Sequence, residues 1–432
     1  MKLIWKISAV WAAAFAALDW WKWISYHADG DFALFIQTMA SGFPSYHNAV
    51  ENTNHFAIHF SPVYAVLSPV IQMTHSVIPV FIVQGIAGAL TGAGIYFLAR
   101  RFMSERRALA VAAVAFLYPA LSGLIFGDPF ENVFAPAATV WLLYAFEVRK
   151  FVLFAVAGIA ALCIKEDQAL FLTVTGAYLA WRFRDDAPRR RAGSLLAAAS
   201  VLTAVLYFGV LQPHLQPAGG WAARSFYDWA HATLDVAPWY SPVRLMYVLE
   251  VFVPLVFLPF RSPMLLLAVF PFLELLASPY SILFTNGTHY AGVWIGYVLV
   301  AFVYGVASLR SQTLAKRLVT ASIVICALQF TLASPAHWRL RLSIPNAHDR
   351  TLTAILNALP RTASIATYEV AYSHLGFYPN AMEGLRGRPD FVVIDSTRPT
   401  SQYFPVLTRF VHGQPGYVLR TSQDGIEVYQ RS

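Results

Sequence analysis

Long apolar runs recur along this chain from Leu3 to Ala333, and they restrict its fold more than any other feature. A helix of about 20 apolar residues crosses the hydrocarbon core of a bilayer, and a soluble domain has no place for so many such runs. Charged residues make up only 12% of the chain, about half of their usual share in soluble domains. The sequence therefore predicts an α-helical polytopic membrane protein.

Apolar length alone gives about eleven transmembrane helices. The predicted spans are 4–24, 76–99, 108–126, 130–147, 151–164, 168–182, 193–212, 243–260, 263–279, 290–308 and 317–334. The segment 61–74 is apolar but short, and Pro62 and Pro69 interrupt it, so it is predicted as an interfacial helix.

The basic residues indicate the orientation. With the N-terminus inside, seventeen basic residues fall in cytoplasmic segments: Lys2, Lys6, Arg100, Arg101, Arg106, Arg107, Arg149, Lys150, Arg182, Arg184, Arg189, Arg190, Arg191, Arg261, Arg310, Lys316 and Arg317. The outer loops hold four: Lys22, Lys165, Arg224 and Arg244. Cytoplasmic loops carry the excess of Lys and Arg, so this distribution places the N-terminus in the cytoplasm and the C-terminus outside. The net charge of +8 is then a topology signal, and nucleic acid is not an expected partner.

The sequence KEDQ, residues 165–168, interrupts an apolar stretch that runs from Phe151 to Trp181. A single helix of that length would extend about 46 Å, too long for a core of about 30 Å. Two short helices that meet at KEDQ resolve the mismatch and keep the basic residues at both ends on one side. KEDQ is then expected at the outer surface.

Composition changes near residue 334 and predicts two domains. Residues 1–334 form the membrane domain, with outer loops at 25–75 and 212–244, and residues 335–432 form a small extracytoplasmic α/β domain. Strand-like runs such as FVVID support the second domain, and Asp424-Gly425 predicts a hairpin turn.

Polar side chains with catalytic or binding potential gather in the predicted outer loops. The first loop contains no Lys or Arg between Tyr26 and Arg100, yet it is rich in His, Asp and Glu. Later outer turns add further titratable groups. The candidates are Asp29, Asp31, Gln37, His55, His59, Glu131, Lys165, Glu166, Asp167, Arg224, His289 and Tyr290. For each residue alone the ordinary reading is a solvated loop side chain, but their common side of the membrane predicts one shared site.

Intramembrane acids are a second class of candidate. Glu250 and Glu274 lie inside predicted spans, where an ionisable residue is by default a functional candidate, although either could cap a neighbouring helix. No Walker loop, GxGxxG unit, HExxH or CxxC occurs, so no nucleotide cofactor is expected.

Five motifs, in the order GDFALFIQ, NHFAIHFSP, FGDPFENVFAP, IKEDQALFL and THYAG, resemble the bacterial membrane-protein family called domain of unknown function 2079. The resemblance covers nearly the whole chain. Two positions depart from the family pattern: Ile36 stands where a second Asp is frequent, and Pro129 where a His is frequent.

That family is similar in layout to the GT-C glycosyltransferases, polytopic enzymes that use a lipid-phosphate-linked sugar and carry an acidic residue in the first outer loop. The resemblance implies Asp31 as the catalytic base, with Asp29 as the alternative. The expected partners are the bilayer, a polyprenyl-phosphate-linked sugar and a glycan, lipid or protein acceptor. The expected location is the bacterial cytoplasmic membrane.

Donor phosphate and substrate would be bound by the remaining outer groups. Lys165 and Arg224, and also Arg244, are the cations available for the phosphate, and His59 and His289 are possible donors. A divalent metal is conceivable, because His55 and His59 would share one face if their segment were helical. Two other function classes stay open: a lipid or sugar transporter or flippase, and a glycolipid-binding protein without catalysis.

Overall fold

The computed structural model describes residues 1–216, 241–278, 280–332 and 343–432. They form two compact units. The first comprises Met1–Ala17, Ala57–Val63 and Val80–Trp338, and the second comprises Leu18–Phe56, Tyr64–Pro79 and Arg339–Ser432. Most of the first outer loop is therefore part of the same compact unit as the C-terminal segment, whereas the boundary predicted at residue 334 assigned that loop to the membrane domain.

The first unit is an all-helical bundle. Its helices are α4 (Ile78–Ala99), α5 (Glu105–Leu117), α6 (Pro119–Ile125), α7 (Ala135–Glu147), α8 (Phe151–Leu162), α9 (Glu166–Arg182), α10 (Ala187–Leu206), α11 (Gln212–Leu215), α13 (Pro242–Phe252), α14 (Leu266–Ala277), α15 (Gly292–Ala307) and α16 (Gln312–Leu332). Helix α1 (Lys2–Ile24) begins in this unit and ends in the second. Nearly every residue of α15 is buried, as expected of a central helix that is apolar on all sides.

The described residues contain five helices long and apolar enough to cross a membrane, or six if one bent pair counts as a single span. The five are Lys2–Ile24, Ile78–Ala99, Ala187–Leu215, His289–Ala307 and Gln312–Leu332. This is a multi-pass membrane protein, and the count of eleven spans stays a prediction.

Prolines explain why several predicted spans are not single straight helices. The predicted span 108–126 consists of α5 and α6, which are bent by 53° at Pro119. The predicted span 243–260 ends as a helix at Phe252 and continues in 3₁₀ turns that contain Pro254 and Pro259. Proline lacks the N–H that an α-helix needs and clashes with the preceding turn.

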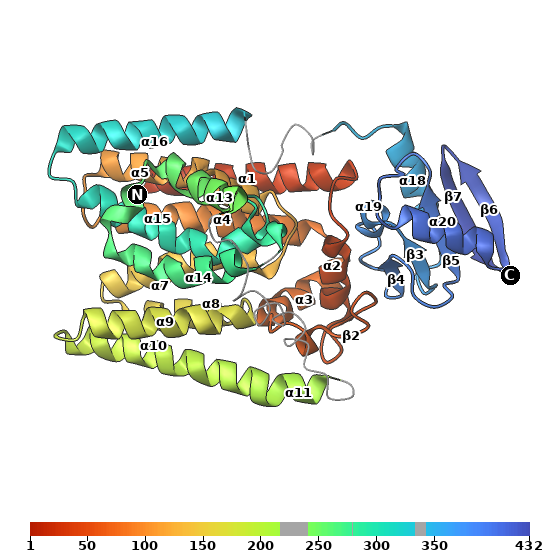
Figure 1. Ribbon diagram of the computed structural model, residues 1–432, viewed down its shortest axis with the longest axis horizontal. Helices are drawn as coiled ribbons and strands as arrows, with labels where there is room; N and C mark the ends of the chain where they lie inside the picture. The colour runs from red at the N-terminus through yellow and green to blue at the C-terminus, as the bar shows by residue number, and fades with distance from the viewer. Residues whose placement is uncertain (217–240, 279, 333–342) are drawn as a thin grey trace. The chain divides into compact units, whose positions relative to one another are not determined.

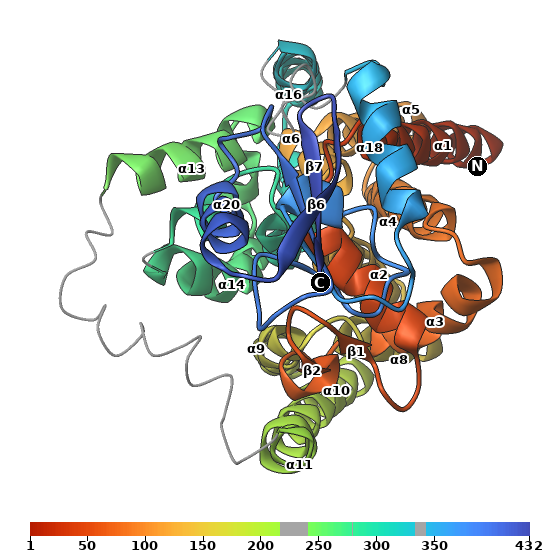
Figure 2. The same ribbon diagram turned by 90° about the vertical axis from the view of Figure 1, so that its right-hand side faces the viewer.

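The apolar stretch breaks into two helices at KEDQ, as the length argument predicts: Lys165 precedes α9, and the other three residues form its first turn. Helix α8 ends at Leu162 and α9 begins at Glu166. Helices α9 and α10 then run side by side (Figures 1 and 2). A Cβ on Gly176 of α9 would come within 2.5 Å of the Ala197 backbone nitrogen, so this glycine allows the two backbones to approach closely.

The second unit contains a five-stranded sheet in the order β4-β3-β5-β7-β6. The strands are β3 (Ile365–Thr367), β4 (Ala381–Glu383), β5 (Phe391–Asp395), β6 (Tyr417–Gln423) and β7 (Ile426–Arg431). Strands β4, β3 and β5 are parallel, and the β6–β7 hairpin adds to β5 in antiparallel register. Its turn residues Asp424 and Gly425 both have positive φ, the conformation of a two-residue hairpin turn.

Helices pack on both faces of this sheet. Helix α18 (Ala347–Ala358) and α20 (Phe404–Gly413) lie on opposite sides of it in Figure 2. Leu407 and Val411 of α20 form a core with Val392 and Ile394 of β5. The unit also includes α2 (Asp31–Ser41), most of α3 (Pro62–Thr74), the short helix α19 (Glu369–Tyr372) and the two-residue strands β1 (His47–Asn48) and β2 (Thr53–Asn54).

Candidate functional site

A cluster of charged side chains forms in the first unit at the turn between α8 and α9. His59 Nδ1 lies 2.8 Å from Glu166 Oε1, and the Phe60 backbone N–H donates to Glu166 Oε2 at 2.8 Å. Glu166 is the first residue of α9, where the helix dipole favours a carboxylate. One carboxylate therefore fixes the segment that carries His59 to the start of α9.

Lys165 and Glu131 form the second pair of this cluster. Lys165 Nζ lies 3.2 Å from Glu131 Oε1, and their side chains are 13% and 2% exposed. Burial alone would lower the pKa of Lys165, but Glu131, Glu166 and Asp167 outweigh it and hold that pKa well above its ordinary value. Lys165 is thus a permanent cation. Among the described residues it makes one ion pair, which leaves two of its three N–H donors available.

His289 and Tyr290 reach the same cluster from the turn before α15. The His289 ring stacks on Phe130 with ring centroids 3.6 Å apart, and it lies within electrostatic range of Lys165, Glu131 and His59. Tyr290 likewise lies within electrostatic range of Lys165. Together, His59, Glu131, Lys165, Glu166, Asp167, His289 and Tyr290 are called the polar cluster below.

His59 gives the polar cluster a titratable group near neutrality. Burial works against the protonated imidazole, but the Glu166 carboxylate outweighs this effect and raises the pKa of His59 above its ordinary value. His59 and Lys165 are both donors in their charged forms, so the polar cluster offers two cationic groups from different segments. Such an arrangement is suited to an anionic oxygen.

The candidate bases lie in the second unit, in a group of four carboxylates. Asp29 and Asp31 flank Gly30, Glu369 begins α19, and Glu383 ends β4. A Cβ on Gly30 would overlap the Glu383 carboxylate, so Glu383 lies directly against the backbone between the two aspartates. Asp29 Oδ1 accepts the Gly30 backbone N–H at 2.7 Å, whereas Asp31 is the first residue of α2.

Glu383, one member of this group, changes its protonation near neutrality. Burial, followed by the negative charges of Asp31, Asp29 and Glu369, raises the pKa of Glu383 from 4.5 to about 8. Tyr403 donates to its Oε1 at 3.4 Å. At pH 7 the protonated form of Glu383 therefore predominates, which reduces the repulsion that Asp31 would otherwise meet.

Glu383 is expected to make the second unit less stable as pH rises. A carboxyl with a raised pKa binds its proton more tightly in the folded chain, so its contribution to stability is complete below about pH 4.5 and is lost as pH rises through about 8. The Glu383→Gln side chain is neutral at every pH, so the variant should lack this pH dependence. Its free energy of unfolding, measured relative to wild type, should therefore be a few kcal/mol higher at pH 9 than at pH 5. Pulse proteolysis of the whole protein in urea at both pH values measures this gain. Glu427→Gln, on β7, is the matched control, and an equal pH dependence in wild type and Glu383→Gln would contradict the assignment.

Gln37, which the sequence predicts as a substrate contact, makes four hydrogen bonds within the second unit. Its amide nitrogen donates to the Tyr378 and Ala381 carbonyls at 2.7 and 2.8 Å. Its amide oxygen accepts the Ala49 N–H at 3.0 Å and the Tyr372 hydroxyl at 3.1 Å. All four of its bonding positions are used by the protein, so Gln37 connects the first outer loop to the C-terminal segment.

The proposed metal pair does not form on one helical face. His55 starts a 3₁₀ turn that ends at Ala57, and its Nδ1 lies 2.9 Å from Glu51, whereas His59 pairs with Glu166. Within the described ranges no group of three or more His, Cys, Asp or Glu side chains is arranged to hold a metal ion.

The structure describes two of three further candidates, Arg244 and Glu250. Arg224 lies outside the described residues. Arg244 donates to the Leu276 and Ser278 carbonyls at 2.8 and 2.9 Å, so it caps the end of α14. Glu250 accepts a hydrogen bond from Asn286 Nδ2 at 2.8 Å and thus holds the turn before His289.

Comparison with known proteins identifies the family. A family model described as "Predicted membrane protein (DUF2079)" matches residues 20–372, which is most of the chain. The chain belongs to this family. No curated protein matches it.

Two solved structures of ArnT from Cupriavidus metallidurans are similar to this family member. The form bound to undecaprenyl phosphate is 13% identical, with coverage of 98% of this chain and 97% of that chain and a TM-score of 0.61. The apo form is 12% identical, with coverage of 98% of both chains and a TM-score of 0.60. At such low identity the likeness shows the fold, which is GT-C-like.

Sequence reasoning missed Glu369 and Glu383. Both lie in the C-terminal segment, more than 330 residues after Asp31 in the chain. Neither stands in a motif or beside another acidic residue, so no local signal distinguishes them from ordinary surface carboxylates. Only the pairing of β3 with β4, and the packing of these elements against Gly30, bring them to the aspartates.

Proposed function

We propose that this protein is a GT-C-type glycosyltransferase. It transfers a sugar from a polyprenyl-phosphate-linked donor to an acceptor at the outer face of the bacterial cytoplasmic membrane. The observation that carries the proposal is the buried Lys165 ammonium, which has unused donors and lies near His59. A buried charge of this kind in a membrane protein usually serves a function. The GT-C-like fold, and the undecaprenyl phosphate held by ArnT, favour a lipid-linked phosphate as its ligand.

In the proposed reaction, Asp31 removes the proton of an acceptor hydroxyl, with Asp29 as the alternative base. The hydroxyl oxygen forms a bond to the anomeric carbon of the sugar as the bond from that carbon to the phosphate oxygen breaks. Polyprenyl phosphate leaves with the electron pair. Lys165 and His59 stabilise the charge that develops on the phosphate, and this kind of stabilisation is usually the largest catalytic contribution. His289, Tyr290 and Arg224 are further candidates for donor contacts.

Transfer by the purified protein tests the proposal. The whole chain in proteoliposomes is incubated with a panel of polyprenyl-phosphate-linked radiolabelled hexoses and pentoses and with a cell-envelope extract as acceptor source. We expect label from at least one donor to move into the chloroform-insoluble fraction. Label that crosses the bilayer while it stays attached to its lipid would instead identify a flippase. Saturable binding of the donor with neither outcome would identify a glycolipid-binding protein without catalysis.

A further inference from the structure

A second polar site lies in the first unit, at the opposite end of α9 from the polar cluster. It is a cavity of about 430 Å³ whose lining includes Glu147, Arg182, Phe183, Arg189, Arg261 and Met264. Glu166 and Arg182 are the first and last residues of α9, about 24 Å apart along its axis. The cavity is therefore separate from the site proposed for the donor, and its volume is within the ~300–1,000 Å³ typical of small-molecule sites.

The cavity is strongly cationic. Its lining includes three arginines and one glutamate, which gives a formal net charge of +2. Glu147 is already engaged, because Tyr304 donates to its Oε2 at 2.8 Å and Arg189 lies 3.9 Å from its Oε1. The single acidic group is thus shared between a hydroxyl and one arginine, and it leaves the charge of the other two uncompensated within the cavity.

The three arginines differ in how much bonding capacity they retain. Arg189 donates to the Glu147 carbonyl at 3.0 Å and lies over the Phe183 ring, so it forms part of the wall. Arg261 donates from Nε to Ser308 Oγ at 3.2 Å, which leaves its two terminal nitrogens available. Arg182 makes no ion pair or hydrogen bond with the described residues; its guanidinium lies 5.6 Å from the Phe183 ring centroid.

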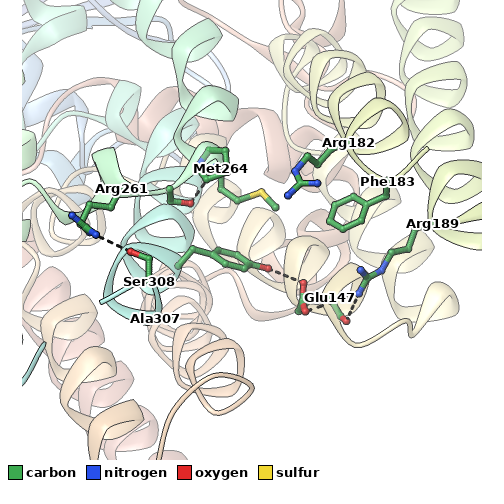
Figure 3. A pocket seen from close by; sticks show the side chains of 11 residues that line it. Glu147, Arg182, Phe183, Arg189, Arg261, Met264, Ala307 and Ser308 are labelled. Atoms are coloured by element: carbon green, nitrogen blue, oxygen red, sulfur yellow. Dashed lines mark hydrogen bonds and ion pairs between the residues drawn. The ribbon is translucent and has the colours of Figure 1, made fainter. Parts of the chain in front are cut away.

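Arg182 and Arg261 are exposed and approach the cavity from different elements. Arg182 ends α9, and Arg261 ends the 3₁₀ turn Leu258–Arg261. In Figure 3 the two guanidinium groups lie on either side of the Met264 side chain, and the Phe183 ring lies next to Arg182. Guanidinium groups at the rim, with apolar side chains between them, are suited to a ligand that combines an anionic group with an apolar tail.

We propose that this cavity binds the phosphate head group of an anionic membrane lipid, held between Arg182 and Arg261. The positive-inside rule assigns this end of α9 to the cytoplasmic face, where anionic lipids gather near basic residues. A planar guanidinium binds a phosphate through two parallel hydrogen bonds, and Phe183 and Met264 provide an apolar surface for the first part of an acyl chain.

Lipid binding to the purified whole protein tests the proposal. A fluorescent short-chain phosphatidylglycerol is titrated against wild type and against the double variant Arg182→Ala, Arg261→Ala in detergent. We expect saturable binding to wild type and a dissociation constant about 25-fold higher for the double variant, from about fivefold for the direct hydrogen bonds of each arginine. The matched control is Arg184→Ala, Arg190→Ala, which removes the same charge from the same face but from residues outside the lining. The control should bind as wild type does, and equal weakening in both pairs would overturn the proposal.

Two further experiments test whether binding needs the space of the cavity as well as its charge, and whether the ligand is a lipid or free phosphate. Ala307→Phe fills the lining without a change of charge and should also weaken binding, with both arginines intact. Inorganic phosphate is expected to compete poorly, and phosphatidylcholine of the same chain length is expected to bind weakly. Full displacement by millimolar phosphate would show a site for a soluble anion, and undiminished lipid binding in Ala307→Phe would place the lipid elsewhere; either result would overturn the assignment.

Discussion

Replacement of Asp31 by Asn is expected to lower the rate of sugar transfer about thousandfold while the protein stays folded. The amide keeps the size and hydrogen-bonding geometry of the side chain but cannot accept the proton of the acceptor hydroxyl, and general-base catalysis typically contributes about 10²- to 10⁴-fold. Asp31 is the first residue of α2, so loss of its charge at the helix N-terminus costs only about 0.3–1 kcal/mol. The measurement is the turnover of the labelled donor, with a thermal unfolding curve for each variant.

Asp29→Asn is the matched control for this prediction. The two aspartates flank the same glycine, and Asp29 already accepts the Gly30 N–H. We expect transfer by Asp29→Asn to fall less than tenfold. A thousandfold loss in Asp29→Asn with little loss in Asp31→Asn would reverse the two roles. Near wild-type turnover in both variants would remove both residues from the reaction.

Lys165→Met is expected to destabilise the first unit by about 3–5 kcal/mol. The substitution removes the ammonium that pairs with the buried Glu131 carboxylate, and a broken buried ion pair costs about that much. The measurement is the free energy of unfolding in mixed micelles. A cost below about 1 kcal/mol would show that water replaces Lys165 at little expense and that the pair is not buried as described.

The double variant Glu131→Gln, Lys165→Met separates folding from function. Removal of both charges should restore most of the stability, since a buried pair replaced on both sides is often close to neutral. Transfer should remain at least about a hundredfold below wild type if Lys165 stabilises the leaving phosphate. Recovery of transfer together with stability would reduce Lys165 to a structural role, and it would remove the observation on which the proposed function depends.

The membrane part of the fold was predictable where apolar length and charge agree. The hairpin at KEDQ and the short helix α3 both follow from the length of an apolar run and from the residues that bound it. The helix breaks at Pro119 and Pro254 could not be predicted in this way. A run of apolar residues has the same hydropathy whether a proline bends it or not.

The loop residues of the polar cluster could be identified from the sequence, whereas the carboxylate group of the second unit could be identified only in part. His59, Lys165 and His289 all stand in loops that the charge distribution assigns to one side of the membrane. Glu369 and Glu383 depend on strand pairing inside the C-terminal segment, and Gln37 depends on carbonyls more than 330 residues away. A pattern along the chain gives the side of a membrane on which a loop lies, but it does not give the long-range contacts that a loop makes.

The Gln37 contacts also have a consequence for the order in which the protein matures. The helix that carries Asp31 is held by groups at Tyr372, Tyr378 and Ala381. About 280 residues separate Leu18–Phe56 from Arg339–Ser432, the two main segments of the second unit. At ~5–20 residues per second, a ribosome needs roughly 15 to 60 s to synthesise these intervening residues. During that time the Gln37 amide lacks the two carbonyls and the tyrosine hydroxyl that bind it from the C-terminal segment. The helix that carries Asp31 therefore completes its set of contacts only after the membrane helices have been synthesised.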